Sequence, residues 1–237
     1  MPAWRLDGQD RQVNHFDVGA VDGTRQGFIS HVLLCLAEQP QVVNVNSRTP
    51  DAVHMGPPLE ERPQPIDAIG TAVLDPGGVQ PTERRQIKVF VDDRLSERKA
   101  QEARMAKLNR RDPYHAEYVI HPPYVEPGED VSLWRFSCAG FVLRAYEEAN
   151  IHLIDVSKVP PIDLDRLKAA YPRFARLLGH AATRTSLGLG EGSEWPVVLA
   201  GYVVNSLNRS PDAIRREAFV PDAGDEFFPP RPLSPKA

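Results

Sequence analysis

Cys138 lies in the stretch of this chain that is best suited to covalent chemistry, between Trp134 and Ala149. From Phe141 onward the apolar residues recur at the three-and-four spacing that marks one buried face of a helix. Cys138 therefore belongs to a first helical turn, where unpaired amides and the positive end of the helix dipole favour an anion. We expect this thiol to lose its proton more easily than a free thiol and to act as a nucleophile.

The residues beside Cys138 fit this interpretation. Ser137 is a typical N-cap, and Ala139 and Gly140 leave little bulk beside the sulfur, so that a substrate carbonyl can approach. The buried face is predicted to carry Phe141, Val142, Ala145 and Ala149, and the opposite face Arg144, Glu147 and Glu148. The alternative is a small, buried and inert cysteine at the start of an amphipathic helix, because free cysteine is among the most often buried residue types.

A thiol nucleophile needs a base, and His31 is the best placed of the seven histidines. It stands in the apolar run from Gly27 to Leu36, which predicts a buried strand with His31, Leu33 and Cys35 on one face. Residues 41–46 predict a second strand that forms a hairpin with the first. Asn44, or alternatively Asn46, would then orient the imidazole from this second strand.

Two other histidines are rivals for the role of base. His180 lies downstream of Cys138, in a segment without a convincing strand, and His121 precedes a proline pair. His15, Asp17 and His31 could be imagined as metal ligands, but their spacing is not diagnostic. We expect no metal and no cofactor.

Two motifs together resemble a known family. Ser30-His31-Val32 opens an apolar strand, and Ser137-Cys138-Ala-Gly-Phe-Val-Leu-Arg-Ala-Tyr146 follows about a hundred residues later. This order resembles the circularly permuted branch of the NlpC-type papain-like proteins, which includes the lecithin retinol acyltransferase relatives. The resemblance implies an α+β, papain-like fold in which an antiparallel sheet packs on the helix that carries the cysteine. It also implies a thiol nucleophile at Cys138, a base at His31 and a polar third residue at Asn44 or Asn46.

The chemistry implied by this resemblance is attack on an amide or ester carbonyl through a thioester acyl-enzyme, as in a thiol protease, amidase or acyltransferase. The substrate would be a peptide, an isopeptide or a lipid acyl group. The alternative is a catalytically silent domain of the same fold that binds a ligand or a protein partner. The motifs cover about a fifth of the chain. They depart from many relatives at Ala139-Gly140, where Ser or Glu is common.

The composition is that of a globular protein, with 41% hydrophobic and 25% charged residues. A net charge of −4 gives no electrostatic argument for nucleic acid, and two cysteines exclude a disulfide scaffold. The first ten residues have no apolar core of signal-peptide length, and no stretch approaches a membrane span, so we expect a cytoplasmic protein without an integral membrane segment. Oligomeric state is not indicated.

The 23 prolines gather in three places and predict long extended connections. We expect one domain over residues 1–220 with an insertion at about 47–85, and a fraying proline-rich tail over 221–237. Further predicted elements are strands at 86–91 and 117–121, an exposed helix at 96–109, a helix at 163–178 that Pro172 interrupts, a flexible glycine-rich loop at 183–194, and a buried helix at 196–207 with Pro196 in its first turn.

Overall fold

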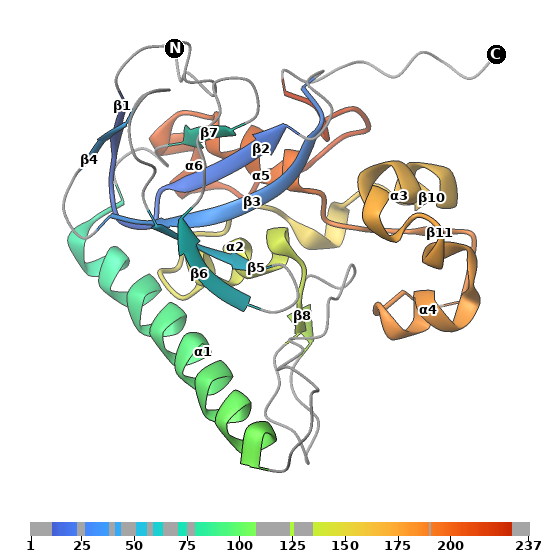
Figure 1. Cartoon of the computed structure of the whole chain (residues 1–237). Helices are drawn as coiled ribbons and strands as arrows, with labels where there is room; N and C mark the ends of the chain where they lie inside the picture. The colour runs from blue at the N-terminus through green and yellow to red at the C-terminus, as the bar shows by residue number, and fades with distance from the viewer. Residues whose placement is uncertain are drawn as a thin grey trace.

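The computed structural model describes residues 11–22, 27–37, 41–43, 51–55, 59–63, 71–74, 79–107, 124–125, 135–189 and 191–228 (Figure 1). The strands are β1 (Arg11–Val13), β2 (Val18–Asp22), β3 (Ile29–Leu36), β4 (Gln41–Val43), β5 (Asp51–Met55), β6 (Leu59–Pro63), β7 (Thr71–Leu74), β8 (Tyr124–Val125), β9 (Arg135–Phe136), β10 (Ile162–Asp163) and β11 (Glu194–Trp195). The α-helices are α1 (Pro81–Lys107), α2 (Cys138–Glu147), α3 (Leu164–Ala170), α4 (Ala181–Ser186), α5 (Ala200–Leu207) and α6 (Pro211–Arg216), and the 3-10 helices are η1 (Val156–Lys158), η2 (Pro172–Phe174) and η3 (Leu177–Gly179).

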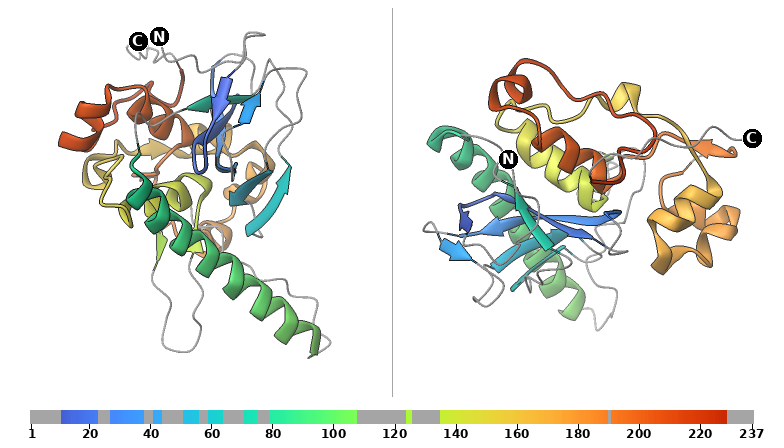
Figure 2. Two further views of the ribbon diagram at one scale, coloured as in Figure 1. Left: turned by 90° about the vertical axis from the view of Figure 1, so that its left-hand side faces the viewer. Right: turned by 90° about the horizontal axis from the view of Figure 1, so that it is seen from above.

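A five-stranded antiparallel sheet forms the centre of this mixed α+β fold. Its strand order is β6-β5-β3-β2-β7, with the predicted strand β3 in the middle. Helices α2 and α5 lie together on one face of the sheet (Figure 2). On that face Val32 and Leu34 of β3 belong to the large hydrophobic core, as do Val18 and Ala20 of β2. The alternation along β3 thus sends every second side chain against the two helices.

The opposite face of β3 carries a much smaller cluster. Leu33 and Cys35 pack there with Val13, Ala37 and Ala52. Gly19 lies directly across from Leu33 in β2, and a Cβ on Gly19 would come within 2.4 Å of the Leu33 side chain. Only glycine fits at that position without moving Leu33.

Helix α1 corrects the prediction of a strand at residues 86–91. The buried side chains there are Ile87, Phe90 and Val91, followed by Leu95, while Val89 is 57% exposed. This is the three-and-four spacing of a helix. A short apolar run can also show the every-second-residue alternation of a strand, which is why the sequence alone was misleading here. Phe90 packs on Phe136 and Phe141, with ring centroids 6.1 and 5.7 Å apart, and so joins the first half of α1 to α2.

Three further expectations about the chain's organisation are wrong. The segment 47–85 is no simple insertion, because β5, β6 and β7 within it are members of the central sheet. β3 and β4 form no hairpin, since β4 pairs with β1. Residues 221–228 do not fray: Phe228 donates its amide to the Gly27 carbonyl, and Ile29 donates to Glu226, so this segment runs beside the start of β3.

Other predictions are confirmed in part. The helix expected at 163–178 ends as α3 at Ala170, and Pro172 opens a separate 3-10 turn. The buried helix begins at Ala200, so that Pro196 precedes it instead of lying in its first turn. The predicted strand at 117–121 lies outside the described residues. None of the helices in the described ranges is long and apolar enough to cross a membrane.

A small helical lobe stands apart from the sheet (Figures 1 and 2). It contains α3, η2, η3 and α4, and the pairing of β10 with β11 closes its neck. Arg166 of α3 forms an ion pair of 2.6 Å with Glu226, which connects the lobe to the segment beside β3.

Candidate functional site

Helix α2 begins at Cys138, as the sequence predicts. The Ser137 side chain is its N-cap and accepts a hydrogen bond from the Gly140 amide at 2.9 Å. The predicted buried face is confirmed, since Phe141, Val142, Ala145 and Ala149 are all buried. Because Ser137 caps the Gly140 amide, the amides of Cys138 and Ala139 remain directed toward the thiol.

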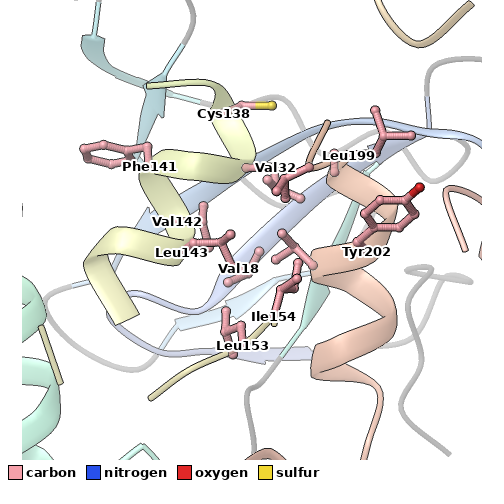
Figure 3. Close-up of a cluster of buried hydrophobic side chains, with 14 of the residues drawn as sticks. Val18, Val32, Cys138, Phe141, Val142, Leu143, Leu153, Ile154, Leu199 and Tyr202 are labelled. Atoms are coloured by element: carbon pink, nitrogen blue, oxygen red, sulfur yellow. The ribbon is translucent and has the colours of Figure 1, made fainter. Parts of the chain in front are cut away.

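The Cys138 thiol meets strand β3 at Val32. The backbone amides of Val32, Ala139 and Cys138 itself act on the thiol and lower its pKa. Figure 3 shows the sulfur at the N-terminal end of α2, pointing away from the helix toward the side where Val32 and Leu199 lie. The thiol thus lies between the first turn of a helix and the central strand of the sheet.

The end of pairing between β3 and β5 explains why the Val32 amide is available. Pairing with β5 runs over Leu34, Cys35 and Leu36 and does not extend to Val32. Cys35 exchanges backbone hydrogen bonds with Phe16 and Asp17, on the β2 side of the strand. Since amides alternate in direction along a strand, Val32 directs its amide to the β5 side, beyond the end of the β3–β5 pairing and near the Cys138 thiol.

The protonation state of Cys138 differs from the prediction. Burial is the largest influence and raises the pKa of the Cys138 thiol, while the three backbone amides lower it without compensating. Cys138 is only 2% exposed. The helix terminus therefore acts in the predicted direction, but desolvation outweighs it, and the thiol keeps its proton at neutral pH unless a base removes it.

His31 lies in β3 immediately before Val32, so the fold brings the thiol beside the residue that follows the predicted base. No hydrogen bond joins the described residues Cys138 and His31. By strand alternation His31 shares the face of Leu33 and Cys35, opposite to that of Val32. The register with β2 shifts by one residue just before His31, between Val21 and Asp22. Such bulges change the direction of side chains.

The remaining predicted site residues are separate from Cys138 or undescribed. Asn44, Asn46 and His121 lie outside the described residues. His180 is exposed and precedes α4 in the helical lobe, away from α2 (Figure 1). Across the described ranges, no group of three or more His, Cys, Asp or Glu side chains is arranged to hold a metal ion.

Tyr146, a residue that fixes helix α2 in place, was not identified from the sequence. Tyr146, two turns after Cys138, is fully buried and donates its hydroxyl to the Phe16 carbonyl at 2.8 Å. Phe16 has a positive φ of 66°, which is uncommon for a residue other than glycine. Its amide donates to the Cys35 carbonyl at 2.7 Å. Tyr146 thus fixes the second half of α2 to the turn that leads into β2. A tyrosine on a helix face predicted to be buried was the sequence signal for this role, because a buried tyrosine hydroxyl usually finds a hydrogen-bond partner.

The second thiol, Cys35, has a different environment. Burial raises its pKa, and the nearby Asp17 carboxylate raises it further. Asp17 is itself fully buried, accepts the Asn14 amide at 2.8 Å and pairs with Arg84 of α1 at 3.4 Å. Cys35 is therefore a core residue, as the sequence predicts.

Comparison with known proteins adds no family to these observations. No family model, no curated protein and no solved structure matches this chain.

Proposed function

We propose that this protein is a cysteine-dependent hydrolase or acyltransferase of the permuted papain-like type, with Cys138 as nucleophile and His31 as base. The observation that supports the proposal is the position of the thiol at the start of α2, where three backbone amides lower its pKa and one of them belongs to Val32, the residue next to His31. Amides in this arrangement stabilise a thiolate as it forms. By alternation His31 lies on the other face of β3, so the proposal requires its imidazole to turn toward the thiol, and the register shift beside His31 is where the strand would allow this.

The proposed reaction follows from these two groups. The His31 imidazole takes the thiol proton, and Sγ attacks the carbonyl carbon of an amide or ester. The bond to the leaving group breaks, the imidazolium protonates the departing amine or alcohol, and a thioester remains on Cys138. Water or an acyl acceptor then attacks the thioester, His31 takes its proton, and the thiol is regenerated. Asn44, or Asn46, would hold the imidazole in the productive tautomer.

Alkylation of the folded protein with iodoacetamide over a pH series tests the proposal. Cys138 should be alkylated in the folded protein, and His31→Ala should slow that alkylation across the pH series, because the base that takes the thiol proton is gone. His180→Ala is the matched control and should change nothing, since His180 is exposed in the lobe. Peptide mapping separates Cys138 from Cys35, which should stay unmodified. A burst of p-nitrophenol from p-nitrophenyl acetate, with an acetyl group retained on Cys138, would identify the thioester.

A second candidate is a catalytically silent domain that binds a ligand or a protein partner. It is favoured by the near-complete burial of Cys138 and by the pKa, which burial raises. In that case Cys138 is alkylated only after unfolding, and His31→Ala leaves its rate unchanged. This result, together with the absence of a p-nitrophenol burst, would exclude the enzyme.

A further inference from the structure

The outer part of the helical lobe has an unusual charge distribution. Residues 166–189, called here the tip segment, contain five Lys or Arg residues and no Asp or Glu. The whole chain, in contrast, has a net charge of −4. The nearest acidic residues in sequence border the segment: Asp165 directly precedes it in the first turn of α3, and Glu191 follows two residues after it. With these two bordering acids counted, residues 165–191 still carry five Lys or Arg residues against two Asp or Glu residues, an excess of positive charge.

Two of these cations are already engaged. Arg166 pairs with Glu226, and Arg184 donates to the carbonyls of Leu178 and Gly179 while lying over the Trp195 ring. Lys168 and the exposed Arg176 form no ion pair with any acidic residue of the described ranges. These two cations remain available to an external anion.

An exposed apolar residue adjoins the free cations. Leu177, which begins η3 directly after Arg176, is 49% exposed. It is one of the few large hydrophobic side chains in the described ranges with this much exposure. A leucine beside basic residues on a small helical unit is the pattern of proteins that rest in the headgroup region of a bilayer, where cations attract anionic headgroups and the apolar side chain enters the interface.

We propose that the tip segment docks on an anionic lipid surface, with Lys168 and Arg176 as its electrostatic contacts and Leu177 as its apolar contact. An anionic lipid fits better than a nucleic acid because an exposed leucine gains free energy in a bilayer interface and gains little from a phosphate backbone. This docking is peripheral and does not depend on thiol chemistry at Cys138.

Vesicle sedimentation with the full chain tests the docking surface. We expect binding to vesicles of phosphatidylcholine and phosphatidylglycerol in equal amounts at low salt, little binding to phosphatidylcholine alone, and loss of binding at high salt. The double variant Lys168→Gln/Arg176→Gln should bind about 25-fold more weakly, since each cation near the surface contributes about fivefold. Leu177→Ser should lose about fivefold by removing the apolar contact.

The matched control is Lys99→Gln/Lys107→Gln, which removes two exposed cations from α1 and makes the same change in net charge. It should alter binding less than twofold. Circular dichroism of each variant checks that the fold is kept. The proposal is overturned if the wild-type chain ignores the mixed vesicles at low salt or if the control loses as much affinity as the tip variant. It is also overturned if a single-stranded oligonucleotide binds the tip and Leu177→Ser has no effect.

Discussion

Two buried thiols lie at strand β3, and their neighbouring groups differ: backbone amides for one and a carboxylate for the other. Cys138 approaches the strand from α2 and is surrounded by backbone amides, whereas Cys35 lies within the strand and faces the Asp17 carboxylate. Burial raises the pKa of both thiols, but the neighbours of Cys138 lower it and the neighbour of Cys35 raises it further. The same burial thus leaves one thiol that a base could activate and one that is held neutral.

The two faces of β3 also differ in the size of the hydrophobic cluster that packs on each of them. Truncating the neighbouring residues Leu33 and Leu34 should therefore cost different amounts of stability. Leu34 lies in the large core between the sheet, α2 and α5, whereas Leu33 packs with four small or medium residues. We expect Leu34→Ala to lower the free energy of unfolding by about 4 kcal/mol and Leu33→Ala by about 2.5 kcal/mol. Urea denaturation measures both, and equal losses would show that the two faces are packed alike.

Removing one hydroxyl tests how the second half of α2 is fixed to the turn before β2. Tyr146→Phe leaves the buried Phe16 carbonyl without its donor and should cost about 2 kcal/mol of unfolding free energy. Tyr202→Phe is a matched control, because Tyr202 of α5 is equally buried and its hydroxyl has no hydrogen-bond partner among the residues that the structure describes. That control should be neutral or stabilising. A larger loss for Tyr202→Phe than for Tyr146→Phe would contradict the role assigned to Tyr146.

The pH dependence of the free energy of unfolding reports the raised pKa of both thiols together. A thiol whose pKa is raised by folding stays protonated in the folded state while the unfolded chain ionises above about pH 8.5, so its stabilising contribution is lost as the pH rises. Each such thiol should lower the free energy of unfolding by about 1.4 kcal/mol per pH unit above that point. Cys35→Ser should remove its share of the slope. An unchanged slope would mean that Cys35 ionises as easily in the folded protein as in the unfolded chain.

The smallest expected effect concerns the cap of α2. Ser137→Ala removes the acceptor of the Gly140 amide and should cost about 1 kcal/mol, with a measurable change in the alkylation rate of Cys138. Ser210→Ala removes the corresponding cap of α6 and should cost a similar amount. Its effect on Cys138 alkylation should be nil. If both variants changed that rate equally, the cap would act only through global stability.

The sequence predicted elements well where local pattern and burial agree. The helix after Cys138, its Ser137 cap and the strand containing His31 all follow from local spacing, and the structure confirms them. The strand expected at residues 86–91 is wrong because Ile87, Val89 and Val91 alternate as in a strand. In the helix it is Phe90, and not Val89, that is buried with Ile87 and Val91. The segment 47–85 has turn-rich composition between its short strands, so local pattern did not reveal their place in the sheet.

The candidate site was predictable only where it depends on local sequence pattern. The position of Cys138 at a helix start is local, whereas its contact with Val32 depends on where β5 stops pairing, which is a tertiary property. The raised pKa also depends on tertiary burial, which outweighs the local effect of the helix terminus. His31 keeps its register with Val21 and by alternation lies on the face opposite Val32, so the local pattern alone does not bring its imidazole to the thiol.

The pairing of residues 226–228 with the start of β3 has a consequence for biosynthesis. Gly27 and Ile29 receive their partners from a segment made nearly two hundred residues later, at the far end of the described chain. Because domains assemble during vectorial synthesis only as their segments emerge from the ribosome, the end of β3 that holds His31 stays incomplete until residue 228 is free. Ribosome-stalled chains that end before Glu226 should therefore lack these two backbone hydrogen bonds, and the start of β3 should be less protected from hydrogen exchange in them.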